Sequence, residues 1–370
     1  MSTPFLKAVL RGLHAVRADQ LFARAASPAR GVIFMLHHVL PHEPKAFSPN
    51  RILKVTPAFL EAVVKETRRA GFDCISLDEA EQRLTHSDGD RPFACFTFDD
   101  GYLDNATYAY PILKRHGVPF AVYVTPAFAD GRADLWWLVL EEAIARSERV
   151  TVPLEAGERT YATATPRQKT VCFHEVYWAL RYMPERCARA IVRSLAAQAA
   201  YDPNELARTL PMTWDDVRAL NQDPLVTIGA HTMNHFALAR LDQDEVRTEM
   251  EGSVARIEAE LGAPCRHFSY PYGDALSAGP REFAIARELG LATAVTTQKG
   301  LVGLAGDAAT RDPLALKRLS LNGDYQDMRY VRVLMSGLPF ALMRATNRLR
   351  PVSRGARDTH VAARFTSRQL

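Results

Sequence analysis

Residues 93–101 read FACFTFDDG, an apolar run with one threonine that is followed at once by two carboxylates and a glycine. The run predicts a strand that is buried on both faces and ends at Asp99, Asp100 and Gly101. Adjacent carboxylates at the end of a buried strand repel each other, and desolvation raises their pKa values. A metal ion would offset both costs. The alternative for this motif alone is that one Asp caps the next helix and the other is solvated.

On both sides of this stretch, strand-like and helical patterns alternate along the chain. Further strands are predicted at 31–39, 118–125, 225–230, 266–270, 291–296 and 316–321, and helices at 56–70, 105–116, 213–221, 243–261 and 280–289. Thr56 is the expected N-cap of the first of these helices, because Pro57 occupies the first helical position. Alternation of this kind predicts a parallel α/β sheet or barrel.

The alternation is interrupted between about 131 and 210. This stretch contains the helical patterns WWLVLEEAIARS (136–147) and CARAIVRSLAAQAA (187–200), with a polar, strand-compatible piece between them. We expect a helix-rich insertion that covers one end of the scaffold. The expected organisation is an N-terminal amphipathic helix within 1–30, an α/β domain over 31–328 and a basic C-terminal segment and tail over 329–370.

Composition excludes several classes of protein. The chain has 370 residues, of which 47% are hydrophobic and 24% charged, as in ordinary globular proteins and unlike disordered or collagen-like chains. No apolar run reaches about 18 residues, so no transmembrane helix is predicted. The five cysteines lack CxxC spacing, and we expect reduced, mostly buried thiols rather than a disulfide scaffold.

The net charge of +4 is unevenly distributed: both ends are basic and the main body is acidic. This pattern does not indicate nucleic-acid binding. Residues 330–350 mix apolar side chains with Arg, which suggests peripheral contact with an anionic membrane, although a helix packed on the barrel is the simpler alternative. The N-terminus lacks a secretory signal pattern. We therefore expect a cytoplasmic protein, with any membrane contact at the inner membrane face.

Three more motifs follow predicted strands. His231 and His235 are spaced to face the same way on a helical turn, and with one carboxylate they would form a facial zinc-ligand set. The turn Tyr270-Pro271-Tyr272-Gly273 can point a backbone N–H inward. His37-His38 ends the first strand. Taken singly, each motif has an ordinary alternative: packing histidines, a strand-to-helix loop or a structural hydrogen bond.

All these motifs lie at the carboxyl ends of predicted strands, where α/β barrels and sheets build their active sites. A closed barrel would bring Asp100 and His231 together. TFDDG (97–101), HTMNH (231–235) and YPYG (270–273), in this order, resemble the polysaccharide deacetylase family, the NodB-homology group also called carbohydrate esterase family 4. The resemblance spans roughly residues 31–130 and 211–322 and leaves the insertion and both basic ends outside.

The resemblance implies a deformed (β/α) barrel and a divalent metal ion, most often Zn²⁺. It implies hydrolytic removal of the acetyl groups of N-acetylated sugars. Because we expect a cytoplasmic protein, the expected substrate is a small glycan or a glycolipid-linked oligosaccharide. Carried over by motif, Asp99 would be the general base, and Asp100, His231 and His235 would be the metal ligands. In the third motif, Pro271 would set the turn and the backbone N–H of Tyr272 would help to form the oxyanion hole.

Two positions depart from the family pattern. Where many members have a third-motif Arg that orients the base, this chain has Ser269 and Tyr270, and Arg318 in LKRLSL is the expected substitute. The late general-acid His is also missing. Here the chain resembles a subgroup with circularly permuted motifs, in which an early strand supplies that His. His37 aligns with it, and His38 is the second candidate, although strand alternation should turn it to the other face.

Two other functions stay open at this stage. One is hydrolysis of another C–N bond, such as that of a cyclic amide or imide. The other is a non-catalytic carbohydrate-binding protein, which the missing third-motif Arg allows and the intact set of Asp and His residues disfavours. Four aromatic residues favour a carbohydrate ligand, with core packing as their alternative: Tyr102, Trp136, Trp137 and Tyr272.

Overall fold

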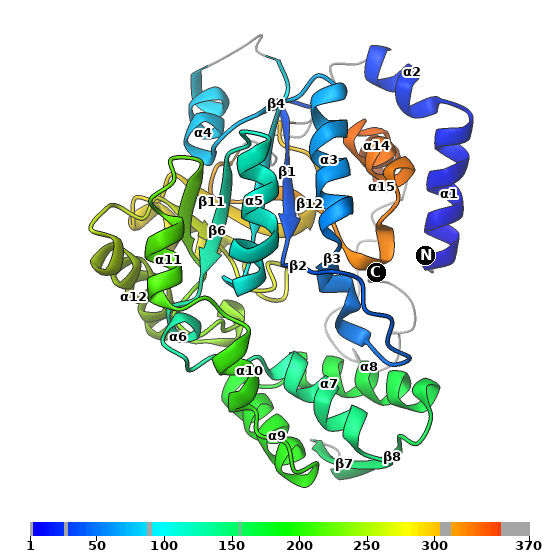
Figure 1. Ribbon diagram of the computed structural model, residues 1–370, viewed down its shortest axis with the longest axis vertical. Helices are drawn as coiled ribbons and strands as arrows, with labels where there is room; N and C mark the ends of the chain where they lie inside the picture. The colour runs from blue at the N-terminus through cyan, green and yellow to red at the C-terminus, as the bar shows by residue number, and fades with distance from the viewer. Residues whose placement is uncertain (1–2, 26–28, 87–90, 155–156, 304–311, 349–370) are drawn as a thin grey trace.

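A closed barrel of parallel strands forms the centre of the protein (Figure 1). The structure, a computed structural model, describes residues 3–25, 29–86, 91–154, 157–303 and 312–348. Around the ring, the strands follow the order β1 (Gly31–Leu36), β12 (Leu316–Ser320), β11 (Thr293–Lys299), β10 (His267–Ser269), β9 (Val226–Ala230), β6 (Phe120–Val124) and β5 (Phe93–Phe98). Pairing of β1 with β5 closes the ring, and the short β4 (Asp73–Cys74) pairs with the start of β5. The expected (β/α) barrel is therefore confirmed.

Helices cover the outside of this barrel: α3 (Pro57–Arg69), α4 (Leu77–His86), α5 (Tyr110–Arg115), α11 (Trp214–Leu220), α12 (Gln243–Leu261) and α13 (Pro280–Glu288). In α3, the Thr56 side chain caps the helix by accepting from the Phe59 N–H, and Leu60 and Val63 are fully buried. Apolar residues at helical spacing thus pack against strands whose residues are buried throughout, such as β1 and β5.

The first predicted strand differs from the structure. Its single run 31–39 divides into β1, which ends at Leu36, and β2 (His38–Val39), which pairs with β3 (Lys54–Val55). The predicted helix 105–116 begins with a π-helical turn, Asn105–Ala109, before α5. These breaks lie at the carboxyl ends of β1 and β5, beside the candidate functional residues.

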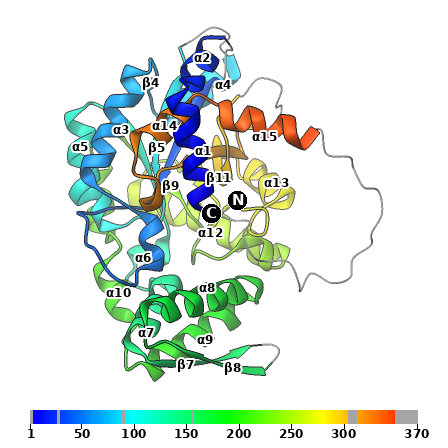
Figure 2. The ribbon, with the colours of Figure 1, turned by 90° about the vertical axis from the view of Figure 1, so that its right-hand side faces the viewer.

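The first and last described helices pack together beside the barrel. The expected N-terminal helix is interrupted at Arg17, whose φ of 54° divides it into α1 (Thr3–Ala15) and α2 (Ala18–Ala25). Leu10 of α1 is buried against Tyr330 and Val333 of α14 (Met328–Met335), and α15 (Leu338–Arg348) follows (Figure 2). Among the described residues, no helix combines the length and the apolar character that crossing a membrane requires. The expected tail beyond 348 lies outside the described residues.

The expected insertion, residues 131–210, forms a separate layer with its own hydrophobic core. After the short α6 (Pro126–Ala129), it contains α7 (Trp136–Arg146), the antiparallel hairpin β7 (Arg149–Leu154) and β8 (Gly157–Ala162), α8 (Pro166–Tyr182), α9 (Glu185–Gln198) and α10 (Asn204–Thr209). Leu140, Val152, Cys172, Val176 and Val192 are buried in its core. Figure 1 shows this layer at the end toward which β1 and β6 point, where parallel barrels carry their active sites.

Within the described residues, short 3-10 helices also lie at Pro49–Leu53, Leu238–Arg240 and Gly323–Tyr325. The cysteines agree with the expectation from the sequence, because all five are free thiols. Three of them are buried (Cys95, Cys172 and Cys265), whereas Cys74 is half-buried and Cys187 is exposed.

Candidate active site

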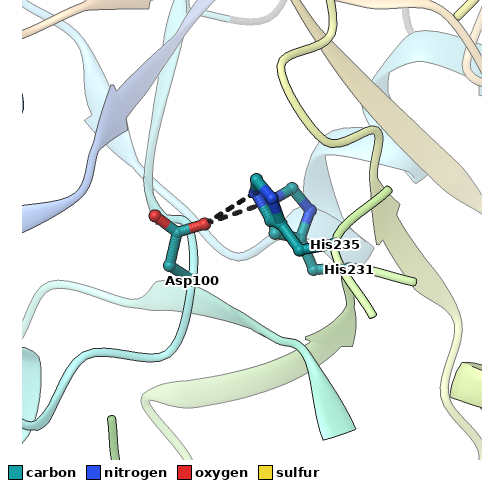
Figure 3. Close-up of side chains that lie close together, drawn as sticks. All are labelled: Asp100, His231 and His235. Atoms are coloured by element: carbon teal, nitrogen blue, oxygen red, sulfur yellow. Dashed lines mark ion pairs between the residues drawn. The ribbon is translucent and has the colours of Figure 1, made fainter. Parts of the chain in front are cut away.

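Asp100, His231 and His235 meet at the carboxyl end of the barrel (Figure 3). Asp100 follows β5, and the two histidines lie in the loop after β9. Oδ1 of Asp100 lies 3.4 Å from Nε2 of His231 and 3.1 Å from Nε2 of His235. All three residues are at most 4% exposed. The structure therefore brings together the three residues that the resemblance implied as metal ligands.

The surroundings of these residues favour their ligand forms. Nδ1 of His231 lies 2.6 Å from the Ser269 carbonyl oxygen, which can only accept, so Nδ1 carries a proton and Nε2 is the ring nitrogen that faces Asp100. Burial lowers the pKa of His235 more than Asp100 raises it. Burial alone would raise the pKa of Asp100, but the neighbouring imidazoles outweigh it and hold this pKa well below its usual range. A buried carboxylate and two imidazole nitrogens fit a divalent ion, zinc above all.

The backbone around these ligands is irregular rather than helical. The expectation that His231 and His235 lie on one helical turn is wrong, because residues 231–237 form a loop. Thr232 and His235 have φ values of 59° and 57°, and Asp100 has 72°, although none of them is glycine. Such left-handed conformations cost about 1–3 kcal/mol each and persist only where surrounding contacts impose them. These contacts, and not helical spacing, bring both imidazoles to Asp100.

Asp99 forms a two-bond ion pair with Arg318 of β12. Nη1 donates to Oδ1 at 2.8 Å and Nη2 donates to Oδ2 at 2.7 Å. Arg318 also donates to Thr97 Oγ1, Ser269 Oγ and the Thr296 carbonyl oxygen, and its side chain has no exposed surface. Burial raises the pKa of Asp99, but the charge and hydrogen bonds of Arg318 outweigh it, and the result is a pKa below the usual value. The structure thus places Arg318 where it can orient Asp99.

The side chains of His37 and His38 point in different directions, as expected, although the two residues do not belong to one strand. Nε2 of His37 lies 3.9 Å from Oδ2 of Asp99, and 19% of the His37 side chain is exposed. Burial lowers the pKa of His37 more than Asp100 and Asp99 raise it. His38 is turned away: its Nδ1 lies 2.6 Å from Oδ2 of Asp104, and its ring stacks on Tyr102. Of the two candidates, only His37 therefore lies beside Asp99.

The third motif forms a tight turn after β10. Tyr272 has a φ of 60°, and its backbone N–H donates no hydrogen bond to the described residues. Its hydroxyl accepts from Trp136 Nε1 at 2.7 Å, and its carbonyl accepts from Thr297 Oγ1. Gly273 is required here, because a Cβ atom would lie 2.5 Å from the Thr297 nitrogen. The turn thus leaves the Tyr272 N–H without a hydrogen-bond partner among the described residues. The ring centroid of Tyr272 lies 4.9 Å from that of His235.

Three of the four aromatic residues that could favour a carbohydrate ligand are buried. Tyr102, Trp136 and Trp137 are at most 5% exposed and belong to the hydrophobic core of the insertion, in agreement with the core-packing alternative.

Sequence reasoning missed Arg181 and Arg189, buried residues of the insertion that reach the loops after β10 and β9. It also missed Asp104, the partner of His38. Arginines on amphipathic helices normally face solvent, so the pattern carried no signal for the first two.

Comparison with known proteins identifies the family. The polysaccharide deacetylase family model matches residues 86–155 and 178–294, just over half of the chain. The matched ranges include much of the insertion and omit β1 and β12, so they differ from the ranges 31–130 and 211–322 that the motifs suggested. The curated protein "Putative polysaccharide deacetylase YxkH" from Bacillus subtilis (strain 168) is 29% identical over 102 residues, 27% of this chain. The chain spans about a third of the length of that protein, 34%.

Solved structures share the fold. The Streptococcus pyogenes deacetylase PplD, solved in complex with acetate, superposes with a TM-score of 0.55 at 17% identity, over 83% of this chain and 99% of that chain. IcaB from Ammonifex degensii superposes with a TM-score of 0.50 at 16% identity, over 83% of this chain and 97% of that chain. Identities this low establish a common fold only. Taken with the match to the family model, they lead to one assignment: this chain belongs to the polysaccharide deacetylase family.

Proposed function

We propose that this chain is a metal-dependent hydrolase that removes N-acetyl groups from an N-acetylated sugar of a glycan or a glycolipid-linked oligosaccharide. One observation carries the proposal: the buried Asp100–His231–His235 set lies beside Asp99, which is held by Arg318. Membership of the polysaccharide deacetylase family supports it. The acetate bound to PplD is the product that such a reaction would release.

Asp100, His231 and His235 would hold the metal ion. When bound there, a divalent ion supplies Lewis-acid polarisation of the acetamide carbonyl and lowers the pKa of water toward roughly 7. Two imidazoles and one carboxylate leave ligand positions open for water and substrate, as in catalytic zinc sites. The remaining groups of the site move and hold protons.

Asp99 acts as the general base. Its lowered pKa keeps the carboxylate ionised at neutral pH, and the two bonds from Arg318 fix its orientation. It accepts a proton from the attacking water as the water oxygen bonds to the acetamide carbon. The developing negative charge on the carbonyl oxygen is stabilised by the backbone N–H of Tyr272, and loss of one such donor typically costs about 10²–10³ in rate.

His37 protonates the leaving nitrogen. Its lowered pKa means that it is neutral before the reaction, so it has to receive the proton that Asp99 took from water. The distance of 3.9 Å from His37 Nε2 to Asp99 Oδ2 places the two groups within a small rearrangement of each other. The C–N bond then breaks, and acetate and the free amino sugar leave. In this scheme the early strand supplies the general acid, as in family members with permuted motifs.

The test is acetate release from N-acetylated glucosamine oligomers by protein loaded with Zn²⁺. Wild type should release acetate, metal-stripped protein should not, and Zn²⁺ should restore the activity. His231→Ala should show neither a tight zinc site in calorimetry nor activity. Turnover of a cyclic imide instead of the oligomers would favour the other C–N hydrolase. Absence of a tight zinc site in the wild type would contradict the proposal and favour a non-catalytic protein.

A further inference from the structure

Two buried arginines of the insertion reach the backbone and side chains of the active-site loops. Arg189 lies on α9, and its side chain is 4% exposed. Its Nη2 donates to the carbonyl oxygens of Asn234 at 3.2 Å and His235 at 2.9 Å. Its Nη1 donates to the Asp134 carbonyl oxygen at 3.1 Å. One planar guanidinium thus links the start of the insertion to the peptide of a candidate metal ligand.

Glu185 completes this contact one helical turn earlier on α9. Its Oε2 accepts from Arg189 Nε at 3.3 Å, and its Oε1 accepts from the backbone N–H of Ala237 at 2.8 Å. The Glu185–Arg189 pair therefore binds backbone groups on both sides of Phe236, the residue that follows His235. From the opposite side, Glu249 of α12 accepts from the Asn234 backbone N–H at 2.9 Å. The loop is held between a barrel helix and the insertion.

Arg181 of α8 makes the corresponding contact with the turn after β10. Its guanidinium carbon lies 3.9 Å from the centroid of the Tyr272 ring, and its side chain is 5% exposed. Its Nη2 donates to Asp274 Oδ2 at 3.1 Å and to Ser277 Oγ at 2.8 Å. The other carboxylate oxygen of Asp274 accepts from the Leu276 backbone N–H. Arg181 thus packs on Tyr272 and anchors the segment that follows it.

These contacts reach the residues whose backbone requires support. His235 and Tyr272 both have a φ near 60°, which side-chain-bearing residues rarely adopt. The hydrogen bond from Arg189 to the His235 carbonyl oxygen fixes the peptide plane on one side of His235. Packing of Arg181 on the Tyr272 ring restricts the conformation of Tyr272. Removal of the support would allow each residue to relax toward an ordinary conformation, which would turn an imidazole or a backbone N–H away from the site.

We propose that the insertion sets the geometry of the active site through these residues: Arg189, with Glu185, positions His235, and Arg181 positions Tyr272. The insertion would then have a role beyond covering the barrel, and the readouts of zinc affinity and turnover rest on the proposed function. The two arginines should therefore affect different quantities, zinc affinity and turnover. Arg189 controls a metal ligand and so acts on metal affinity, whereas Arg181 controls the oxyanion donor and so acts on turnover.

The experiment compares Arg189→Met and Arg181→Met with Arg193→Met. Arg193 is the matched control, since it also lies on α9 and donates to Asp134 but is 56% exposed and has no hydrogen bond to either loop among the described residues. We expect Arg189→Met to lower zinc affinity about 10–100-fold, the range for groups that orient metal ligands. We expect Arg181→Met to retain zinc affinity and the KM for N-acetylated glucosamine oligomers while kcat falls about 10²-fold. Arg193→Met should behave as wild type.

Amide hydrogen exchange supplies a readout that does not depend on activity. Faster exchange should be confined to residues 232–237 in Arg189→Met and to 272–277 in Arg181→Met. If a Met variant fails to fold, the corresponding Lys variant decides the matter, because it retains the charge but loses the planar, multiply bonded head group. Folded variants with wild-type exchange, zinc affinity and kcat would overturn the proposal. A wild type without zinc binding or turnover would instead contradict the proposed function, and the exchange data would still test the two arginines.

Discussion

Arg318 and Asp99 lie 219 residues apart in the chain and form an ion pair with two parallel hydrogen bonds inside the barrel. Their side chains are 0% and 3% exposed. Such a pair is strongly coupled, because removal of one partner leaves an uncompensated buried charge. The third motif of this chain lacks the Arg that many family members place beside the base. Arg318 of β12 supplies the positive charge beside Asp99 instead.

Arg318→Met should destabilise the fold by about 3–5 kcal/mol, the typical cost of leaving a buried ion unpaired. It should also raise the pKa of Asp99, because the cation that lowers it is removed and burial remains. A base with a raised pKa is protonated at higher pH, so the acidic limb of the kcat/KM profile should move to higher pH. Urea unfolding and a pH–rate profile measure the two effects.

The matched control for this prediction is the double variant Arg318→Met with Asp99→Asn. Removal of both charges should restore much of the lost stability, whereas turnover should fall below that of Arg318→Met because no base is present. Equal stability of Arg318→Met and wild type would show that the ion pair does not hold the barrel in solution.

Asp99→Asn and Asp100→Asn should separate catalysis from metal binding. The first variant removes the proton acceptor but no candidate ligand, so it should bind zinc as wild type does while turnover falls about 10²–10⁴-fold. The second should lose the tight zinc site, because only two imidazoles remain. Zinc calorimetry and acetate release, measured on the same preparations, give both values. Loss of zinc binding in Asp99→Asn would mean that Asp99 is itself a ligand.

His37→Asn should lower turnover, whereas His38→Asn should lower folding stability. His37 faces Asp99 and is partly exposed, so its replacement should lower turnover about 10²–10⁴-fold with little change in stability. His38 is buried against Asp104, so its replacement should cost about 1–3 kcal/mol of folding stability. Thermal unfolding and acetate release distinguish them. A reversed pattern would make His38 the proton donor.

Glu66 should make folding stability depend on pH at a site outside the candidate active site. Burial raises its pKa, but Arg69 and Arg332 outweigh this effect and lower the pKa to about 2, from an ordinary value of 4.5. The ion pair with Arg332 joins α3 to α14. Because the folded-state pKa is the lower one, the stabilisation is complete above pH 4.5 and declines as the pH falls toward 2.

Glu66→Gln should therefore be less stable than wild type at pH 7 by about 1 kcal/mol, since one partner is substantially exposed to solvent. The difference should disappear as the pH approaches 2. Urea unfolding of both proteins between pH 2 and 7 measures it. A destabilisation that is independent of pH would assign the effect to packing rather than to charge.

Most of the barrel could be predicted from the sequence, because buried parallel strands and amphipathic helices carry strong periodic signals. The strand 93–98 and the helix that Thr56 caps agree with the structure to within a residue. The break after Leu36 could not be predicted, because GVIFMLHHV is uniformly apolar up to its histidines. Its cause is tertiary: His38–Val39 pairs with Lys54–Val55 instead of continuing in the barrel.

The residues of the candidate site could also be predicted only in part from the sequence. Residues within motifs, such as Asp100 and His231, could be named from the sequence, because each follows a predicted strand. Arg318 could be suggested only because the motif lacked its usual Arg. The loop conformation at His235 and the approach of Arg189 could not be foreseen, because they depend on contacts between segments that are distant in the chain.

Placement of the counter-ion of Asp99 on β12 also has a consequence for the order in which the protein matures. During synthesis, β5 leaves the ribosome long before Arg318 exists, so the carboxylate at its end must stay hydrated until the last barrel strand arrives. Arrival of β12 would then complete the ring and neutralise the base together. A chain truncated before residue 316 would lack both, so catalytic competence and a complete barrel should appear together in the newly made protein.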